Sequence, residues 1–209
     1  SKSRTCEIAT KIKRDFGVES VAHLTCINST KADIDCNLAL FKENGIENIL
    51  ALRGDRVEGV EPQKDFTYAS DLCRYIASQG DFDIAGACYP EVHSEATVED
   101  IHILRKKVES GASHLISQLF FDNSVYYRFL ERAKIAGVNV PIEAGIMPVT
   151  SKSQIERMVS MCGASLPAKF AKIMQKYDTR PEALRDAGIA YAVDQIVDLI
   201  AHGVDGIHL

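Results

Sequence analysis

The chain has 209 residues and a formal net charge of −5. Hydrophobic residues make up 46% of it and charged residues 25%, a composition that is typical of a globular protein and excludes a disordered or fibrous chain. The 24 lysines and arginines are scattered, so we expect neither a nucleic acid nor a membrane surface as partner. The six cysteines form no CxxC pair and the chain has no apolar run of membrane-spanning length, so we expect a reduced, cytoplasmic protein.

Six short apolar runs recur along the chain and predict six strands. They cover residues 21–26, 48–53, 83–89, 114–121, 141–147 and 206–209. Near-continuous apolar runs of this length suit a parallel sheet that is buried on both faces.

The segments between these runs have helical spacing and helix-capping residues. Thr30 is placed to cap a helix that runs to Lys42 and ends before Gly45. Further helices are predicted over residues 70–78, 97–110, 124–136, 151–161 and 181–201, with an extra helix between residues 166 and 177. Strands that alternate with helices predict repeated βαβ units, and the recurring glycine between helix and strand favours a closed barrel over an open sheet.

Polar side chains follow five of the predicted strands at their carboxyl ends. These groups are His23, Thr25 and Cys26; Arg53, Gly54 and Asp55; Tyr89, Pro90, Glu91 and His93; Gln118 and Asp122; and Pro148 and Thr150. Because the active sites of parallel barrels lie at this end of the strands, the pattern predicts an active-site mouth.

Several polar and aromatic residues, some of them at these strand ends, also have a purely structural interpretation. His23 could be a hydrogen-bonded histidine of the interior, Asp55 a turn residue, and Tyr68 and Tyr89 core aromatics, while Asp100 and Lys107 would be surface charges. Gln118 interrupts an apolar strand, and a buried amide is costly unless it is hydrogen-bonded, so its functional interpretation is stronger.

A metal centre is a second possibility for the same rim. His23, Cys26, Cys88, Glu91, His93 and Asp122 are all of ligand type, but no pair has the tight spacing of a ligand motif, so no metal is expected. The chain has no glycine-rich dinucleotide fingerprint and no P-loop.

The phrases AHLTC, ALRGD, TYASDL, YPEVH, SQLFFD and AGIMPVTS, in this order, closely resemble the methylenetetrahydrofolate reductase family over essentially all of the chain. The resemblance implies a (β/α)8 TIM barrel that carries FAD, takes reducing equivalents from NAD(P)H and reduces 5,10-methylenetetrahydrofolate to 5-methyltetrahydrofolate. Such an enzyme is an oxidoreductase of one-carbon metabolism that serves methionine biosynthesis. A homo-oligomer is also expected.

The resemblance assigns roles to particular residues. It places Asp55 at the flavin ring as the catalytic residue, where a negative charge disfavours the anionic reduced flavin and assists hydride transfer. The cofactor-binding residues it implies are His23, Arg53, Gly54, Asp55, Tyr68, Ala69, Tyr89, His93, Asp100 and Lys107. The substrate-binding residues it implies are Asp55, Gln118 and Gln154. Met158 stands where the family can place an aromatic residue that stacks on the nicotinamide.

Two departures from the family pattern shape these expectations. The family's general acid is a glutamate in a phrase like FEFFPP on the first strand, and this chain has no such phrase. The sequence also stops at Leu209, within what the resemblance implies is the eighth strand and before the family's folate-contacting arginine. We therefore expect residues 1–209 to form a single barrel domain that is incomplete at both ends, with strands three to eight present and the first two missing. The alternatives are a non-catalytic folate- or flavin-binding subunit of the same fold and a metal-dependent barrel hydrolase.

Overall fold

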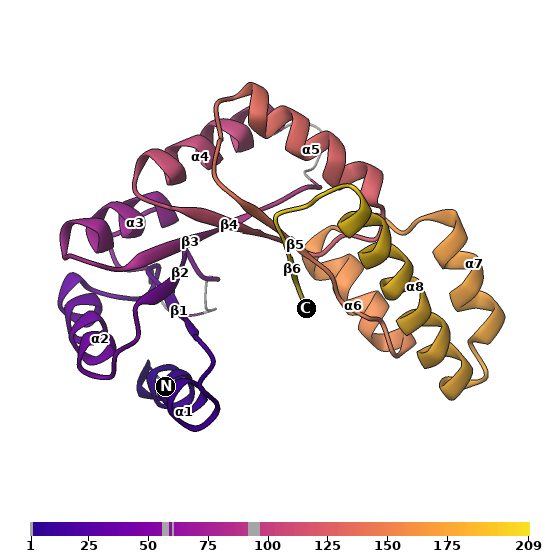
Figure 1. Cartoon of the computed structure of the whole chain (residues 1–209), viewed down its shortest axis with the longest axis horizontal. Coiled ribbons are helices and arrows are strands. Elements are labelled where there is room, and N and C mark those ends of the chain that lie inside the picture. The colour runs from indigo at the N-terminus through magenta and orange to yellow at the C-terminus, as the bar shows by residue number, and fades with distance from the viewer. Residues whose placement is uncertain (1, 56–58, 60, 92–96) are drawn as a thin grey trace. The chain divides into compact units, whose positions relative to one another are not determined.

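The computed structural model describes residues 2–55, 59, 61–91 and 97–209. Within them the chain forms eight helices and six strands, in the alternating order expected of βαβ units (Figure 1). The elements are α1 (Lys2–Phe16), β1 (Val21–Thr25), α2 (Lys31–Glu43), β2 (Asn48–Leu52), α3 (Ala69–Ser78), β3 (Asp83–Cys88), α4 (Thr97–Glu109), β4 (His114–Ser117), α5 (Asn123–Ile135), β5 (Ile142–Gly145), α6 (Lys152–Cys162), α7 (Ala168–Tyr177), α8 (Pro181–Ala201) and β6 (Gly206–His208).

The strands follow one another in the sheet in the order of the chain, β1-β2-β3-β4-β5-β6. The pairs β1–β2, β2–β3 and β5–β6 are parallel. All six predicted strands and every predicted helix are present, so the prediction of a parallel α/β fold is confirmed. The strands are shorter than predicted at their carboxyl ends: the fourth stops at Ser117, well before Phe121.

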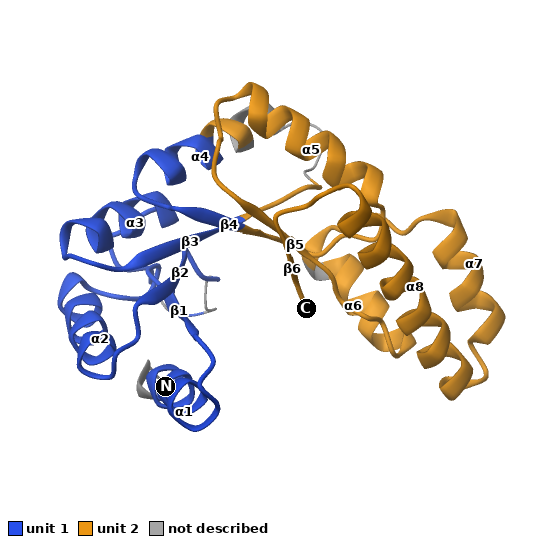
Figure 2. Cartoon of the chain, viewed as in Figure 1, with its two compact units in different colours: residues 1–87, 103–115 blue, residues 88–102, 116–209 orange. Residues whose placement is uncertain are grey.

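The chain divides into two compact units (Figure 2). Unit 1 comprises residues 1–87 and 103–115, and unit 2 comprises residues 88–102 and 116–209. The prediction of one barrel domain that is incomplete at both ends stays a prediction.

Unit 1 is built on β1, β2 and β3, with its core between these strands and helices α1 to α3. Ala22 and Leu24 of β1 face this core together with Ile34 and Phe41 of α2. Helix α2 begins as predicted, because Thr30 accepts a hydrogen bond from the Asp33 N–H and the Asp33 carboxylate accepts one from the Thr30 N–H in return. The alternating burial along β1 leaves Val21, His23 and Thr25 on the opposite, exposed face.

Unit 2 carries β5 and β6, which pair in register from Glu143 and Gly206 onward. Its apolar cluster gathers Phe121, Val149, Ile155 and Phe170, contributed by the segments that follow β4 and β5 and by α6 and α7. None of the described helices is long and apolar enough to cross a membrane.

Candidate active site

The turn that follows β2 presents two charged side chains at the carboxyl end of that strand. The Arg53 carbonyl accepts a hydrogen bond from the Ile27 N–H at 2.9 Å, which fixes the backbone of the turn to the end of β1. Gly54 has a φ of 85°, and a Cβ at this position would lie 3.0 Å from the Cβ of Thr25, so both conformation and space require glycine. The side chains of Arg53 and Asp55 are exposed beside it.

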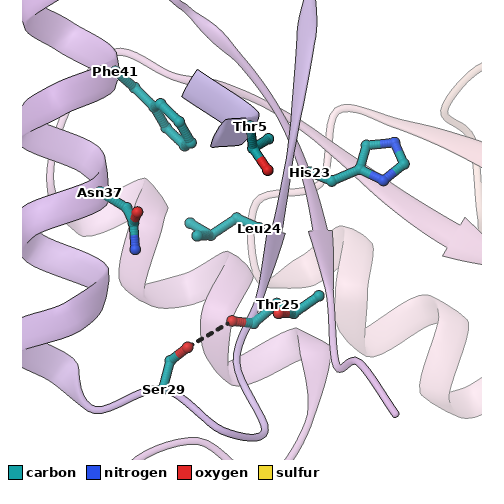
Figure 3. A pocket seen from close by; sticks show the side chains of 7 residues that line it. All are labelled: Thr5, His23, Leu24, Thr25, Ser29, Asn37 and Phe41. Carbon is teal, nitrogen blue, oxygen red and sulfur yellow. Dashed lines mark hydrogen bonds between the residues drawn. The ribbon is translucent and has the colours of Figure 1, made fainter. Parts of the chain in front are cut away.

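His23 lies on the exposed face of β1, in register with Leu50 of β2. Figure 3 shows its ring turned away from Asn37 and Phe41, which line the same pocket of about 270 Å³ on the helical side of the strand. This placement excludes the structural interpretation of His23 as a histidine of the apolar core. It leaves the ring on the sheet face that the helices of unit 1 do not cover.

A second pocket of unit 1, of about 390 Å³, joins two of the predicted cofactor-binding residues. It is lined by Ile27, Arg53, Pro62, Gln63, Lys64, Phe66, Thr67 and Tyr68. It therefore combines two cationic side chains with an aromatic ring that is 55% exposed, that of Tyr68. An aromatic ring beside cations can hold a flat, negatively charged ligand.

Two aspartates that the sequence reasoning missed hold the loop that carries Tyr68. The Asp65 carboxylate accepts a hydrogen bond from the Lys31 N–H at 2.7 Å, at the first turn of α2. The Asp71 carboxylate accepts from the N–H groups of Thr67 and Tyr68 at 3.1 and 2.9 Å. The signal for Asp71 was its place three residues after Tyr68, the N-cap of α3, where an acidic side chain caps a helix. Ala69, the first residue of α3, is buried behind this loop.

Lys107 is buried, with 8% of the residue exposed, and its Nζ donates a hydrogen bond to the Ala87 carbonyl at 2.6 Å. The interpretation of Lys107 as a surface charge is therefore wrong. A lysine is rarely buried unless a partner compensates its charge, and here the Ala87 carbonyl, near the carboxyl end of β3, accepts its hydrogen bond. The side chains of Asp100 and His93 lie outside the described residues.

Two buried cysteines of unit 1 are unreactive at neutral pH. Burial raises the pKa of Cys26 to about 11, and the nearby Asp71 carboxylate adds to the effect. Burial likewise raises the pKa of Cys73 to about 11. Both thiols therefore stay protonated at neutral pH and are poor nucleophiles and metal ligands. Over the part of the chain that the structure describes, no three histidine, cysteine or acidic side chains form a group that could hold a metal ion.

In unit 2, the two predicted substrate-binding glutamines use their amide oxygens in the same way. The Gln118 Oε1 accepts a hydrogen bond from the Leu119 N–H at 3.0 Å, and the Gln154 Oε1 accepts from the Thr150 N–H at 2.9 Å. Since a backbone N–H requires an oxygen, these bonds fix the orientation of both amides. The NH2 group of each glutamine is therefore the end of the amide that can donate a hydrogen bond elsewhere.

Two further residues with predicted roles lie in unit 2. Tyr89, just beyond β3, is 50% exposed, which is more than a core aromatic would be. Met158 packs against the apolar cluster of unit 2. Of the predicted residues, Arg53 and Tyr68 thus line one pocket of unit 1. Gln118 and Gln154 lie in unit 2, where the amide oxygen of each accepts a hydrogen bond from a nearby backbone N–H.

Comparison with known proteins gives a consistent result. The family model described as methylenetetrahydrofolate reductase matches residues 1–209. The 5,10-methylenetetrahydrofolate reductase of Escherichia coli is 37% identical over 99% of this chain and 70% of its own length. The methylenetetrahydrofolate reductase (NADH) 1 of Arabidopsis thaliana is 36% identical over 98% of this chain, which spans only 38% of that protein.

Solved structures show the fold at lower identity. A Clostridium thermocellum protein that binds two copies of 5-methyl-5,6,7,8-tetrahydrofolic acid is similar with a TM-score of 0.55 and 16% identity, over 99% of this chain and 82% of that one. A 2,3-dimethylmalate lyase is similar with a TM-score of 0.52 and 11% identity, over 98% of this chain and 78% of that one. These similarities support the predicted TIM-barrel class. On the match of the whole sequence, the chain belongs to the methylenetetrahydrofolate reductase family.

Proposed function

We propose that the protein reduces 5,10-methylenetetrahydrofolate to 5-methyltetrahydrofolate, with FAD as cofactor and NAD(P)H as electron donor. The observation that carries this proposal is the match of the family model over residues 1–209. The polar side chains at the carboxyl ends of the strands of each unit support it, because enzymes of this fold class place their active sites there. NAD(P)H as donor, a homo-oligomeric state and a cytoplasmic location are predictions of the same proposal.

The side chains of unit 1 fit a flavin nucleotide. The exposed ring of Tyr68 supplies an apolar face, and Arg53 and Lys64 supply positive charge in the same pocket. Such a combination suits a ligand that joins flat rings to a pyrophosphate. We assign His23, Arg53, Gly54, Asp55, Tyr68, Ala69 and Lys107 of unit 1 to flavin binding, with Tyr89, His93 and Asp100 as further cofactor contacts. When bound, FAD supplies the two-electron chemistry that amino-acid side chains lack.

Asp55 is the residue to which we assign the catalytic role. Its exposed carboxylate at the end of β2 would place a negative charge beside the flavin. That charge raises the free energy of a negatively charged reduced flavin and so favours hydride release toward the folate. We assign substrate binding to Asp55, Gln118 and Gln154. The NH2 groups of the two glutamines would donate to hydrogen-bond acceptors on the substrate.

The substitution Asp55→Asn tests this assignment because it removes the charge and keeps the shape. We expect FAD to remain bound and kcat for methylenetetrahydrofolate reduction to fall by about 10² or more, the range seen when an electrostatic group of an active site is removed. Steady-state kinetics and the visible flavin spectrum measure the two quantities. Asp81→Asn, at an exposed aspartate elsewhere in unit 1, is the matched control and should leave both unchanged.

Three results would count against the proposal. A full-length protein that binds no FAD contradicts it, and stoichiometric zinc in place of flavin would favour the hydrolase alternative. A protein that binds FAD and folate but shows no turnover would instead be the non-catalytic subunit.

A further inference from the structure

A glutamate outside the proposed catalytic and binding residues lies just beyond β3. Glu91 belongs to unit 2 and follows the buried Pro90. Its Oε2 accepts a hydrogen bond from the Ser165 N–H at 2.7 Å. This distance is that of a strong, charge-assisted hydrogen bond. The bond joins two segments that are 74 residues apart in the sequence.

The other oxygen of this carboxylate, Oε1, lacks a hydrogen bond that would offset its loss of water. Glu91 Oε1 is buried and has no hydrogen-bond partner in the structure as described. A buried carboxylate oxygen that has lost water and gained no donor destabilises the folded state. A glutamate in such a position is typical of a functional site, where local stability is given up for geometry.

The loop that Glu91 contacts is constrained on both sides and connects α6 to α7. Gly163 ends α6 in the left-handed conformation, with a φ of 64° and its N–H donating to the Val159 carbonyl. Ala164 is buried in the apolar cluster of unit 2, and Pro167 leads into α7. The Ser165 N–H is therefore the point at which this short loop is held by Glu91, another residue of unit 2.

Helix α6, which ends at this loop, carries Gln154 in its first turn. The Gln154 amide is itself fixed by the Thr150 N–H, so its NH2 group moves with the helix. A displacement of the loop at Ser165 would therefore be transmitted along α6 to the donor of Gln154. Met158, on the same helix, packs against the apolar cluster, so we expect α6 to move as a rigid body.

We propose that Glu91 is a positioning residue of the folate site, which holds α6 and the Gln154 amide in place through the Ser165 N–H. This inference rests on the proposed function, since it concerns the folate that Gln154 would contact. Glu91 acts through the loop and touches neither substrate nor flavin. Its loss should therefore weaken folate binding and leave flavin reduction by NAD(P)H intact.

The test compares Glu91→Ala with the wild type in the full-length protein. Hydrogen–deuterium exchange, read on peptides that cover residues 163–167, should show faster exchange at Ser165 by about tenfold, because its carboxylate acceptor is gone. KM for methylenetetrahydrofolate and Kd for 5-methyltetrahydrofolate, measured by titration calorimetry, should rise by about five- to tenfold with kcat changed less than about twofold.

Three further variants make the result specific. Glu91→Gln should restore most of the affinity, because the glutamine oxygen can accept the same hydrogen bond. Glu131→Ala removes an exposed glutamate of α5 in the same unit and should change nothing. If Glu91→Ala does not fold, Glu91→Asp serves instead, since its shorter side chain cannot reach Ser165 at the same distance.

The outcomes separate this inference from the function on which it rests. A wild-type protein that binds no 5-methyltetrahydrofolate overturns the proposed function and this inference with it. If the wild type binds folate, an unchanged KM and Kd despite faster Ser165 exchange overturn the positioning role alone. Equal losses in flavin reduction and in folate binding would also overturn it, because they would indicate a general structural defect.

Discussion

The core of unit 1 is filled largely by aliphatic and cysteine side chains between strands and helices, whereas unit 2 adds stacked aromatic rings and a polar network that joins two helices. In unit 1, Ile34 and Leu38 of α2 belong to the same apolar cluster as Ile49 and Ala51 of β2. In unit 2, the rings of Phe120 and Tyr126 stack with centroids 4.8 Å apart.

The network of unit 2 joins α5 to α8 through hydrogen bonds of their side chains, and the Asn123 amide also donates to the Gln195 carbonyl of α8. The Asp198 carboxylate of α8 accepts hydrogen bonds from the Asn123 amide at 2.7 Å and from the Tyr127 hydroxyl at 2.6 Å. The His202 ring stacks on that of Tyr127. The two units therefore offer different substitutions as tests: the loss of a core ring in unit 1, and the loss of a charge from a network that joins two helices in unit 2.

The largest effect is expected where the core of unit 1 loses a ring. Phe41 is 1% exposed and packs in the apolar cluster of this unit. We expect Phe41→Ala to lower the free energy of unfolding by about 3–5 kcal/mol, because it leaves a cavity that the surrounding side chains fill only in part. Denaturant titration measures this loss.

Phe16→Ala is the control for Phe41→Ala, since this ring of α1 is 73% exposed, and it should cost less than about 0.5 kcal/mol. Hydrogen–deuterium exchange should show the loss of protection of Phe41→Ala concentrated in β1 and β2. Equal loss in unit 2 would contradict the view that the core of unit 1 is a structure of its own.

A close backbone approach in unit 2 gives the next effect. A Cβ on Gly188 of α8 would lie 1.7 Å from the Val149 carbonyl oxygen, so helix or loop must move to admit one. We expect Gly188→Ala to lower the free energy of unfolding by about 3 kcal/mol, although alanine is the better helix former. Thermal unfolding followed by circular dichroism measures the change.

Gly203 provides the comparison for Gly188, because it has a φ of 72° and a Cβ added there would meet nothing within 4 Å. Gly203→Ala should cost about 1–2 kcal/mol, from backbone strain alone. If both variants lost the same amount, the contact with Val149 would not determine the packing of α8.

The fold was predictable because its signals are local. Apolar runs and capping residues such as Thr30 mark the strands and helices of both units, and the elements form where these signals place them. The predicted strands were too long at their carboxyl ends, because buried apolar residues such as Leu119 and Phe121 continue beyond the last residue of β4. Hydrophobicity reports burial, and it does not report where a backbone leaves the sheet.

The candidate site was predictable only in part. The resemblance named Arg53 and Tyr68, and these two do line one pocket. The sequence could not show that Lys107 is buried on the Ala87 carbonyl, or that Glu91 reaches Ser165, because both contacts join segments that are distant in the chain. The orientations of the two glutamine amides also depend on backbone geometry that no spacing rule encodes.

The smallest effect is expected from the charge of Asp198, and it depends on pH. The Asn123 amide and then the Tyr127 hydroxyl, with the nearby His202, hold the pKa of Asp198 below its ordinary value. A carboxyl group whose pKa is lower in the folded state stabilises the protein above its unfolded pKa, which is about 3.9. This stabilisation is lost as the pH falls through the lowered value, when the folded state also becomes protonated.

We therefore expect Asp198→Asn to lower the free energy of unfolding by less than about 1 kcal/mol at pH 7, since the asparagine keeps one acceptor oxygen and solvent screens the charge of this partly exposed carboxylate. The difference from wild type should shrink as the pH falls below about 4, because protonation removes the same charge from Asp198 itself. Asp194→Asn, on the same helix and in an exposed ion pair with Lys169 at 3.3 Å, should cost less at pH 7, because such pairs contribute little. Urea titrations of the three proteins at pH 7 and at pH 3 measure these differences. A loss for Asp198→Asn that is the same at both pH values would mean that shape, and not charge, makes this network stabilise unit 2.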